Sequence, residues 1–358
     1  MVGGFLGAGK TTAILKLAEH LAGRGKRIGL ITNDQSVDLV DTARAKAAGH
    51  AVAEITGGCF CCKFDSLVDA SRELTRQTAP EVLIAEPVGS CTDLKATVSY
   101  PLRQLYGSEY DVAPLSVLVD PIRCARVLRL DRGRIFSDKV VYVYRKQLEE
   151  AEILVINKID LFEPALRAQI ADALRAQFPQ ASVIEMSCRT GEGMGPWFDR
   201  VTTGQPGHSN AMQVDYDQYA EGEALLGWLN ARAALSADAD FDGNALLLKL
   251  ASTLRQRLAA GGIEVAHLKM TLAPSTGPDL GAVSLTQTDG EAQPTHTLKA
   301  PLSEGTLVIN LRAEADPELL KSHTVAALAA LPSVRHDIRL IQSFRPGRPT
   351  PTHRISHS

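Results

Sequence analysis

The sequence has no apolar run that approaches the roughly 20 residues of a membrane-spanning helix, and it does not open with a charged and then apolar signal segment. It also has no basic excess, because 38 Lys and Arg residues stand against 41 Asp and Glu residues and the formal net charge is −3. We therefore expect neither a membrane nor nucleic acid as a partner, and we expect a cytoplasmic protein.

Cysteine is scarce too, and six cysteines in 358 residues do not form a disulfide framework in a chain of this class. Three of them nevertheless fall within four positions, at Cys59, Cys61 and Cys62. The other three stand alone: Cys91, Cys124 and Cys188. Because 45% of the residues are hydrophobic, the chain can bury a large core, and it is long enough for two domains.

What the sequence does contain begins at residues 4–12, which fit the phosphate-binding pattern G-x-x-x-x-G-K-[ST]. Glycines let backbone N–H groups approach phosphate oxygens, Lys10 can reach the β- and γ-phosphates, and the Thr11 hydroxyl can ligate Mg²⁺. The helical pattern that follows places the loop at a helix N-terminus, whose dipole favours an anion. A glycine-rich turn before a helix is the alternative. The candidate nucleotide-binding residues here are Gly7, Ala8, Gly9, Lys10, Thr11 and Thr12.

Only Met1 and Val2 precede the glycine pair at 3–4, although a buried strand of about five residues usually leads into such a loop. Our hypothesis is that the start codon has been placed too late. An in-frame upstream start followed by apolar residues would support this hypothesis, and a stop codon directly upstream would contradict it.

Apolar strands alternate with helical stretches in the first two hundred residues, which predicts a mostly parallel sheet covered on both faces. The expected strands are residues 27–32, 51–55, 82–85, 115–119, 153–156 and 182–186. Helices are expected at residues 38–48 and 65–78.

Residues 202–210 are rich in Gly, Ser, Thr and Pro, as is typical of a linker. We therefore expect an α/β P-loop domain over 1–201, a linker over 202–215, and a smaller α+β domain over 216–345. In the second domain we expect strands near 223–232, 264–272, 281–286, 306–310 and 335–342, with helices at 244–260 and 317–330. Residues 346–358 have three prolines and no apolar face, so a disordered tail is expected.

The motif Asn157-Lys158-Ile159-Asp160 follows an expected strand, at the edge where open α/β sheets place their ligands. Asp160 can accept hydrogen bonds from the N1–H and the exocyclic amine of guanine, and Asn157 can support the loop and the base edge. The Lys158 stem can pack on the ring. Downstream of a phosphate-binding loop, this motif favours guanine over adenine.

Three further positions lie just after expected strands. Glu86 can hold Mg²⁺ through water or polarise the attacking water, although an ordinary acidic strand end is the alternative. Gly89 permits a backbone N–H to meet the γ-phosphate, and the turn at Ser187 and Cys188 could close over the base. The candidate catalytic residues are Lys10, Thr11 and Glu86.

The segment G-G-C-F-C-C at residues 57–62 is the second motif on which the functional prediction depends. Three thiolates this close together, at Cys59, Cys61 and Cys62, can bind a soft or borderline cation such as Zn²⁺. A buried thiol cluster and a reactive redox pair are the alternatives. Because three cysteines leave a tetrahedral site one ligand short, we expect an open or labile site whose fourth ligand could be water, Asp34 or Asp38.

Together these motifs resemble the CobW/UreG/HypB group of P-loop GTPases, whose members deliver or insert metal ions. The resemblance covers about residues 3–200. Residues 4–12 are similar to the group's GFLGAGKTT loop, 59–62 to the CobW-type C-x-C-C, 86–89 to its E-x-x-G and 157–160 to its guanine motif. Gln147, before Ala151 and Glu152, resembles the group's segment leading into the strand at 153–156.

The sequence also departs from the group. Asn33-Asp34 is similar to the T-N-D of urease accessory GTPases rather than to the N-E-F-G-E of CobW-like members, and Phe60-Cys61 replaces the Pro-His that would bind nickel. The C-terminal region lacks a histidine-rich tract. This mixture leaves the identity of the metal open.

The resemblance implies a cytoplasmic GTPase that couples GTP binding and hydrolysis, with Mg²⁺ at Thr11, to the transfer of Zn²⁺ or Co²⁺ to a client metalloprotein. GTP would order residues 33–41 and 57–62, and loss of the γ-phosphate would relax them. GTP-dependent homodimerisation is a further hypothesis. Two other classes stay open, namely a small-molecule kinase with a structural cysteine cluster and a non-enzymatic scaffold.

Overall fold

The computed structural model describes residues 1–33, 50–205, 207, 211–331 and 334–356. The chain divides into two compact units. Unit 1 consists of Met1–Ala220 together with Arg348–Ser358, and unit 2 is Glu221–Gly347. Unit 2 is thus inserted between two parts of unit 1. The helix expected at residues 38–48 lies outside the described residues.

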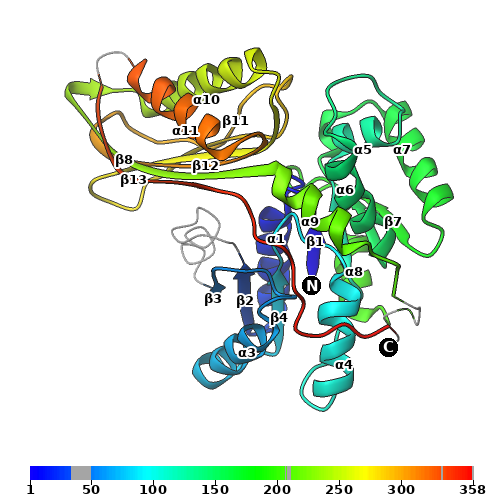
Figure 1. Ribbon diagram of the computed structural model, residues 1–358. Helices are drawn as coiled ribbons and strands as arrows, with labels where there is room; N and C mark the ends of the chain where they lie inside the picture. Colours follow the sequence, from blue (N-terminus) through cyan, green and yellow to red (C-terminus); the bar gives the residue numbers. More distant parts are fainter. Residues whose placement is uncertain (34–49, 206, 208–210, 332–333, 357–358) are drawn as a thin grey trace. The chain divides into compact units, whose positions relative to one another are not determined.

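The described part of unit 1 contains two sheets whose strands all run parallel (Figure 1). One sheet has the order β1-β5-β6-β7 and the other β3-β2-β4. The strands are β1 (Val2–Gly4), β2 (Ile28–Asn33), β3 (Ala51–Ile55), β4 (Val82–Glu86), β5 (Ser116–Val119), β6 (Ile153–Ile156) and β7 (Ser182–Glu185). Every residue of β5 and β6 is buried, as the apolar runs of a doubly covered parallel sheet predict.

Helix α1 (Lys10–Gly23) joins the two sheets in one core. Its apolar residues recur at helical spacing, and Ala13, Ile14, Leu17 and Ala18 are buried. The helix packs against β1, β2 and β4, so its core cluster includes side chains from both sheets. No helix among the described residues is long and apolar enough to cross a membrane.

The other helices of unit 1 lie between these strands or after β7. They are α3 (Phe64–Thr78), a π-helical turn (Lys95–Ser99), α4 (Tyr100–Tyr106), α5 (Pro121–Val127), α6 (Asp138–Glu150), a 3₁₀ turn (Ile159–Leu161), α7 (Pro164–Gln177) and α8 (Met194–Thr203). Helix α9 (Tyr216–Leu225) contains the boundary between the two units, at Ala220. Helix α9 includes residues 223–225, where the sequence predicted the start of a strand.

The proline-rich end of the chain differs from the disordered tail that was expected. The Thr352 N–H donates to the Cys61 carbonyl at 2.9 Å, and the Ile355 N–H donates to the Ala96 carbonyl at 2.8 Å. Arg354 forms an ion pair with Asp93, with Nε and Oδ2 2.7 Å apart. The segment lacks an apolar face, so its order comes from hydrogen bonds to distant parts of unit 1.

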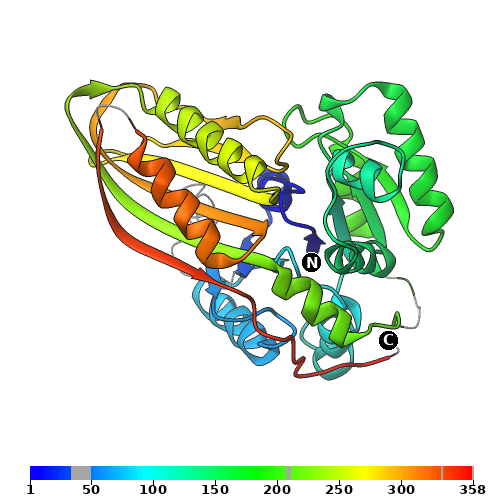
Figure 2. The same ribbon diagram turned by 45° about the horizontal axis from the view of Figure 1, so that its top comes forward.

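Unit 2 contains, in its described residues, a six-stranded sheet of order β11-β10-β9-β12-β8-β13, whose pairs are antiparallel. Helices α10 (Gly243–Ala260) and α11 (Pro317–Ala329) lie on the same face of this sheet in Figures 1 and 2. The strands are β8 (Leu226–Phe241), β9 (Glu264–Pro274), β10 (Gly281–Leu285), β11 (Gln293–His296), β12 (Leu302–Glu314) and β13 (Arg335–Phe344). The predicted α+β class is confirmed.

Strands β8, β11 and β12 differ most from the sequence prediction. Strand β12 spans Leu302–Glu314, whereas a strand was expected only at 306–310. Strand β8 continues to Phe241 because β12 and β13 pair with its two edges, although its Ala- and Asp-rich second half has weak strand propensity. Strand β11 was not predicted, and all four of its residues are exposed.

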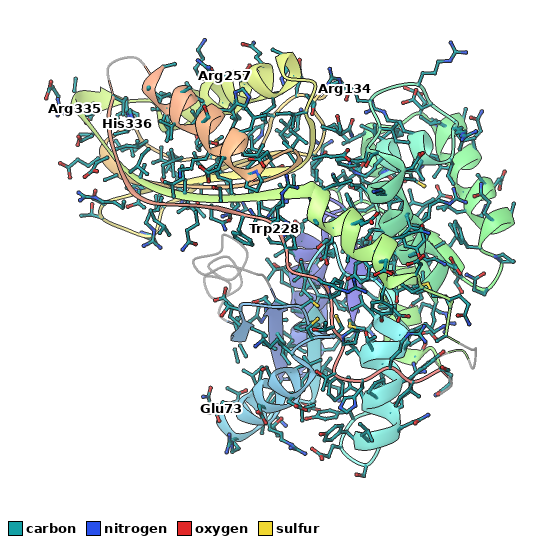
Figure 3. The ribbon with its side chains drawn as sticks, in the orientation of Figure 1. Glu73, Arg134, Trp228, Arg257, Arg335 and His336 are labelled. Atoms are coloured by element: carbon teal, nitrogen blue, oxygen red, sulfur yellow. The ribbon has the colours of Figure 1, made fainter. Side chains whose placement is uncertain are left out.

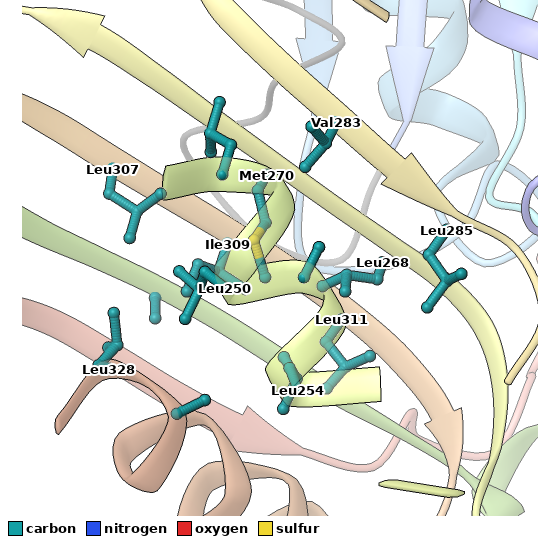
Figure 4. Packing of buried hydrophobic residues seen from close by; sticks show 14 of the residues in the cluster. Leu250, Leu254, Leu268, Met270, Val283, Leu285, Leu307, Ile309, Leu311 and Leu328 are labelled. Atoms are coloured by element: carbon teal, nitrogen blue, oxygen red, sulfur yellow. The ribbon is translucent and has the colours of Figure 1, made fainter. Parts of the chain in front are cut away.

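Helix α10 shows how the core of unit 2 forms. The Asp242 side chain caps it by accepting hydrogen bonds from the N–H groups of Asn244 at 2.8 Å and Ala245 at 3.0 Å. Leu250 and Leu254 then point toward the sheet, as Figure 4 shows. Each buried leucine stabilises the fold by about 2 kcal/mol. The sheet residues labelled in this cluster are Leu268, Met270, Val283, Leu285, Leu307, Ile309 and Leu311.

A buried arginine lies in the same sheet. Arg312 of β12 is opposite Trp228 of β8, which Figure 3 labels, and its guanidinium carbon is 4.0 Å from the ring centroid. Its Nη1 donates to Asn230 Oδ1 and to the Leu229 carbonyl, both at 2.9 Å. These contacts compensate part of the cost of burying a charge.

A carboxyl group is buried where α6 ends in unit 1. Glu150 accepts hydrogen bonds from the Thr92 hydroxyl at 3.2 Å and from the Lys95 N–H at 3.1 Å. Burial, with the nearby charge of Asp93, raises the pKa of Glu150 to about 8.

This raised pKa predicts a pH-dependent stability. Between its ordinary pKa of 4.5 and about 8 the folded state holds a proton that the unfolded chain releases, so the free energy of unfolding falls as the pH rises through this window. Glu150→Gln removes this titrating group. Between pH 5.5 and 8.5 the free energy of unfolding in urea should therefore decrease by roughly 3 kcal/mol less in Glu150→Gln than in the unmodified protein. Glu149→Gln is the control, because Glu149 is exposed, and parallel profiles for Glu150→Gln and the unmodified protein would contradict the prediction.

Candidate functional site

The loop between β1 and α1 adopts a conformation that requires glycine. Gly4, Gly7 and Gly9 have φ angles of 126°, 81° and 94°, which residues with a side chain rarely adopt. A Cβ atom at Gly4 would lie 2.4 Å from the Leu118 carbonyl oxygen, and one at Gly9 would lie 2.4 Å from Asn157 Nδ2. The backbone of the loop therefore lies too close to β5 and to the residue after β6 to allow a side chain at Gly4 or Gly9.

Lys10 and Thr11 are in the first turn of α1, and both side chains are buried. Lys10 Nζ donates to the Phe5 carbonyl at 3.2 Å, so the ammonium group lies across the loop. The Thr11 hydroxyl donates to Glu86 Oε1 at 2.9 Å. The structure thus brings together all three candidate catalytic residues, and it places two oxygen ligands of the kind Mg²⁺ prefers side by side.

Gly89, which follows β4, lies against the same loop. A Cβ atom there would lie 2.8 Å from Leu6 Cδ2 and 3.0 Å from Lys10 Nζ. The buried side chain of Gln147, on α6, donates through Nε2 to the Gly89 carbonyl at 3.0 Å. From the sequence, Gln147 was noted only as part of a segment that resembles the one preceding the strand at 153–156 in the family. Its contact with Gly89 forms only when α6 packs against the segment after β4.

The side chain of Asn157 connects two loops. Its Nδ2 donates to the Ala8 carbonyl at 2.9 Å, and its Oδ1 accepts from the Cys188 N–H at 3.1 Å. Lys158 Nζ donates to the Gly7 carbonyl at 2.8 Å and to Asp120 Oδ2 at 2.7 Å. The motif after β6 is therefore attached directly to the phosphate-binding loop.

Asp120 is a site residue that the sequence reasoning missed. It follows β5, caps α5 by accepting from the Arg123 N–H at 3.1 Å, and forms the ion pair with Lys158. Burial opposes its ionisation, but the charges of Lys158 and Arg123 hold the pKa of Asp120 below its ordinary value. The signal was available, since an acid directly after an apolar strand is the same pattern that singled out Glu86.

Asp160 lies in the 3₁₀ turn that follows the Asn157-Lys158 pair. The Ser187 hydroxyl donates to Asp160 Oδ1 at 2.5 Å, and Arg189 forms an ion pair with the same carboxylate. The Ser187 oxygen in turn accepts the N–H groups of Arg189 at 3.2 Å and Thr190 at 3.1 Å. The turn after β7 thus orients the carboxylate expected to recognise guanine.

The three clustered cysteines converge in the turn between β3 and α3. Their Sγ atoms are separated by 2.6 Å for Cys59 and Cys61, 3.3 Å for Cys59 and Cys62, and 3.7 Å for Cys61 and Cys62. Cys59 and Cys61 are buried, and Cys62 is partly exposed. Such a set of sulfur donors fits a soft or borderline metal ion.

The thiols of the cluster do not ionise alike. Hydrogen bonds from Cys61 and then Cys62 lower the pKa of Cys59, whereas sharing the same proton with Cys59 raises the pKa of Cys61. The cluster therefore stabilises a thiolate, which is the form that binds metal ions.

Besides the Thr352 N–H that donates to the Cys61 carbonyl, groups from β2 and from residue 350 contact this turn. Asn33 Nδ2, at the end of β2, donates to the Gly58 carbonyl at 2.7 Å. The Thr350 N–H donates to Cys62 Sγ at 3.2 Å. The proposed acidic ligands Asp34 and Asp38 lie outside the described residues.

Comparison with known proteins follows the same residues. A family model described as the CobW/HypB/UreG nucleotide-binding domain matches residues 1–185. Two similar curated proteins are the zinc chaperone YeiR of Escherichia coli, 32% identical over 46% of this chain and 47% of that protein, and the hydrogenase maturation factor HypB of Azotobacter chroococcum mcd 1, 30% identical over 53% of this chain and 55% of that protein. The chain therefore spans about half the length of these curated relatives.

Among solved structures, HypB from Helicobacter pylori in complex with nickel is similar with a TM-score of 0.43 and 18% identity, covering 58% of this chain and 89% of that one. The family model matches more than half of the chain, and it includes the phosphate-binding loop, the cysteine turn and the motif after β6. The chain belongs to the CobW/HypB/UreG family of nucleotide-binding proteins.

Proposed function

We propose that this protein binds and hydrolyses GTP and couples its nucleotide state to the binding of Zn²⁺ or Co²⁺ and its transfer to a client metalloprotein. The observation that carries the proposal is a short connection between the two candidate sites. Thr32 of β2 pairs with Glu86 of β4, and the next residue, Asn33, donates to the Gly58 carbonyl of the cysteine turn. A displacement of Glu86 would therefore be transmitted through β2 and Asn33 to the turn that carries the thiols.

The phosphate end of the site has the groups that GTP hydrolysis needs. Lys10 and the N-terminus of α1 offset the negative charge of the β- and γ-phosphates. Thr11 and Glu86 would hold Mg²⁺, which neutralises charge on the phosphate oxygens. Glu86 can also orient the attacking water.

The base end supports guanine as the recognised base. The carboxylate of Asp160 can accept two hydrogen bonds from guanine, whereas adenine offers no matching pair of donors on that edge. Ser187 and Arg189 hold this carboxylate in place, and Asn157 and Lys158 attach it to the phosphate-binding loop.

The thiol cluster supports a transition metal as the cargo. Sulfur ligands favour Zn²⁺ over hard ions such as Mg²⁺ or Ca²⁺, and Co²⁺ accepts the same tetrahedral geometry. Two of the curated relatives carry the name zinc chaperone. Release of phosphate from GTP without an added acceptor would distinguish this function from that of a small-molecule kinase.

Gly9→Ala is expected to weaken GTP binding by more than about tenfold. An alanine here would have to adopt the φ of 94° that Gly9 has, which is strained for a residue with a side chain. Its Cβ atom would also overlap Asn157 Nδ2, so the loop would change its conformation. Titration with a fluorescent GTP analogue measures the effect. Gly23→Ala is the matched control, since a Cβ atom there meets nothing within 4 Å, and equal affinities of the two variants would contradict the assignment of the loop.

Asp160→Ala should weaken GTP binding by about 3 kcal/mol and leave the weak binding of ATP unchanged, because only guanine donates to this carboxylate. Competition of each nucleotide against the labelled GTP analogue gives both affinities. Asp172→Ala, on the exposed face of α7, is the control. A parallel loss of GTP and ATP binding would show that Asp160 supports the fold and does not select the base.

Coupling predicts that Zn²⁺ or Co²⁺ binds about tenfold more tightly with a nonhydrolysable GTP analogue than with GDP. Lys10→Ala should make the two metal affinities equal, since it removes the response to the γ-phosphate. The combined serine variant at Cys59, Cys61 and Cys62 should lose the metal and still bind GTP. Metal competition titrations with each nucleotide measure these values, and equal metal affinities in the unmodified protein would remove the coupling.

A further inference from the structure

Residues 350–356, drawn in red near the end of the chain in Figure 1, lie against the cysteine turn. The Thr350 N–H donates to Cys62 Sγ at 3.2 Å, and the Thr352 N–H donates to the Cys61 carbonyl at 2.9 Å. The Thr352 hydroxyl also donates to the Cys62 carbonyl at 3.4 Å. Donors from one short segment thus contact two of the three clustered cysteines.

The same segment is anchored at its other end, away from the thiols. Arg354 Nε is 2.7 Å from Asp93 Oδ2, and Arg354 Nη2 donates to the Met212 carbonyl at 2.9 Å. The Ile355 N–H donates to the Ala96 carbonyl at 2.8 Å. These contacts include no atom of the cysteine turn, so they hold the segment in place independently of it.

We propose that residues 350–356 form a removable cover over the cysteine turn, and that the thiols exchange a metal ion with a client when this cover is released. Cys62 is partly exposed, so the thiols lie near the surface, where a short segment controls access to them. The proposal deepens the proposed function and rests on it where the metal ion is concerned. The contacts of the cover itself involve protein groups alone.

The cover has the properties of a segment that opens while the rest of unit 1 stays folded. Thr350, Thr352 and Arg354 are exposed, and the segment has no apolar face that would bury a large area. Segments held mainly by exposed hydrogen bonds open at a lower free energy than the whole domain unfolds. Release of the cover is therefore a local event.

The contact between Arg354 and Asp93 is the strongest that holds the cover closed, because both groups are charged and the carboxylate is buried. The Asp93 side chain is 1% exposed, and a buried carboxylate without a donor is costly. The Tyr216 hydroxyl donates to the same Oδ2 atom at 2.7 Å, and Tyr216 belongs to α9. Asp93 therefore keeps one donor when Arg354 leaves.

The cover is tested in the metal-free full chain by the rate at which iodoacetamide alkylates the three clustered cysteines, followed by mass spectrometry. Arg354→Ala should raise this rate by more than about tenfold, because it removes the charged contact that keeps the cover closed. Arg335→Ala is the matched control, since it removes an exposed ion pair with Asp238 in unit 2. Equal alkylation rates in the two variants would overturn the proposal.

Thr352→Pro is a second variant, which decides the question even if Arg354→Ala does not fold. It removes the N–H that donates to the Cys61 carbonyl and places a proline after Pro351 in a segment already rich in proline. The alkylation rate of the cluster should rise here too, and an unchanged rate would overturn the proposal.

Cys124 distinguishes release of the cover from unfolding in the same samples. It is a fully buried thiol on α5, so it reacts only when unit 1 unfolds. Its alkylation rate should be equal in both variants and in the unmodified protein. A parallel rise at Cys124 in both variants would show that residues 350–356 support the whole unit and would overturn the cover.

Transfer of Zn²⁺ then separates the cover from the proposed function. A chromogenic chelator in excess should remove Zn²⁺ more than about tenfold faster from Arg354→Ala than from Arg335→Ala, and Zn²⁺ should also bind faster. Faster removal with an unchanged rate of binding would indicate a weaker site and would overturn the cover. If the unmodified protein binds no Zn²⁺ while Arg354→Ala still speeds alkylation, the proposed function is overturned and the cover is retained.

Discussion

The side-chain amide of Asn157 is the contact on which the nucleotide end of unit 1 depends. Its donor reaches the Ala8 carbonyl and its acceptor receives the Cys188 N–H, so one planar group sets the positions of three segments. Gly9 has to be a glycine because the amide occupies the space that a Cβ atom would need. The geometry of the phosphate-binding loop is therefore fixed from the far end of the site as well as from its own backbone.

Neutral amides hold the other segments around the site in the same way. Gln147 donates to carbonyl groups after β4, and Asn33 donates to the Ile55 carbonyl at the end of β3 and to the Gly58 carbonyl of the cysteine turn. An amide satisfies buried carbonyl groups without the desolvation cost of a charge. These contacts hold the backbone around the site without adding a charge to it.

The features that could be predicted from the sequence are those that depend on residues close together in the chain. Buried parallel strands are continuous apolar runs, so β2 to β7 were found close to their observed bounds, and contiguous motifs revealed the residues at both candidate sites. Contacts between distant segments escaped it. The contacts of Asp120 with Lys158 and of Arg189 with Asp160 form only when the sheets pack. The final segment was expected to be disordered because it has three prolines and no apolar face. Its hydrogen bonds to remote partners leave no periodic pattern in the sequence.

The contact between Thr350 and Cys62 joins residues 288 positions apart, with all of unit 2 between them in the chain. Ribosomes make a protein from its N-terminus, so the cysteine turn and its sheets emerge long before residue 350 is added. The Cys62 sulfur therefore lacks this donor throughout most of synthesis. An ion acquired in that interval would enter a turn that residue 350 has not yet reached, and the proposed metal site would gain the Thr350 contact last.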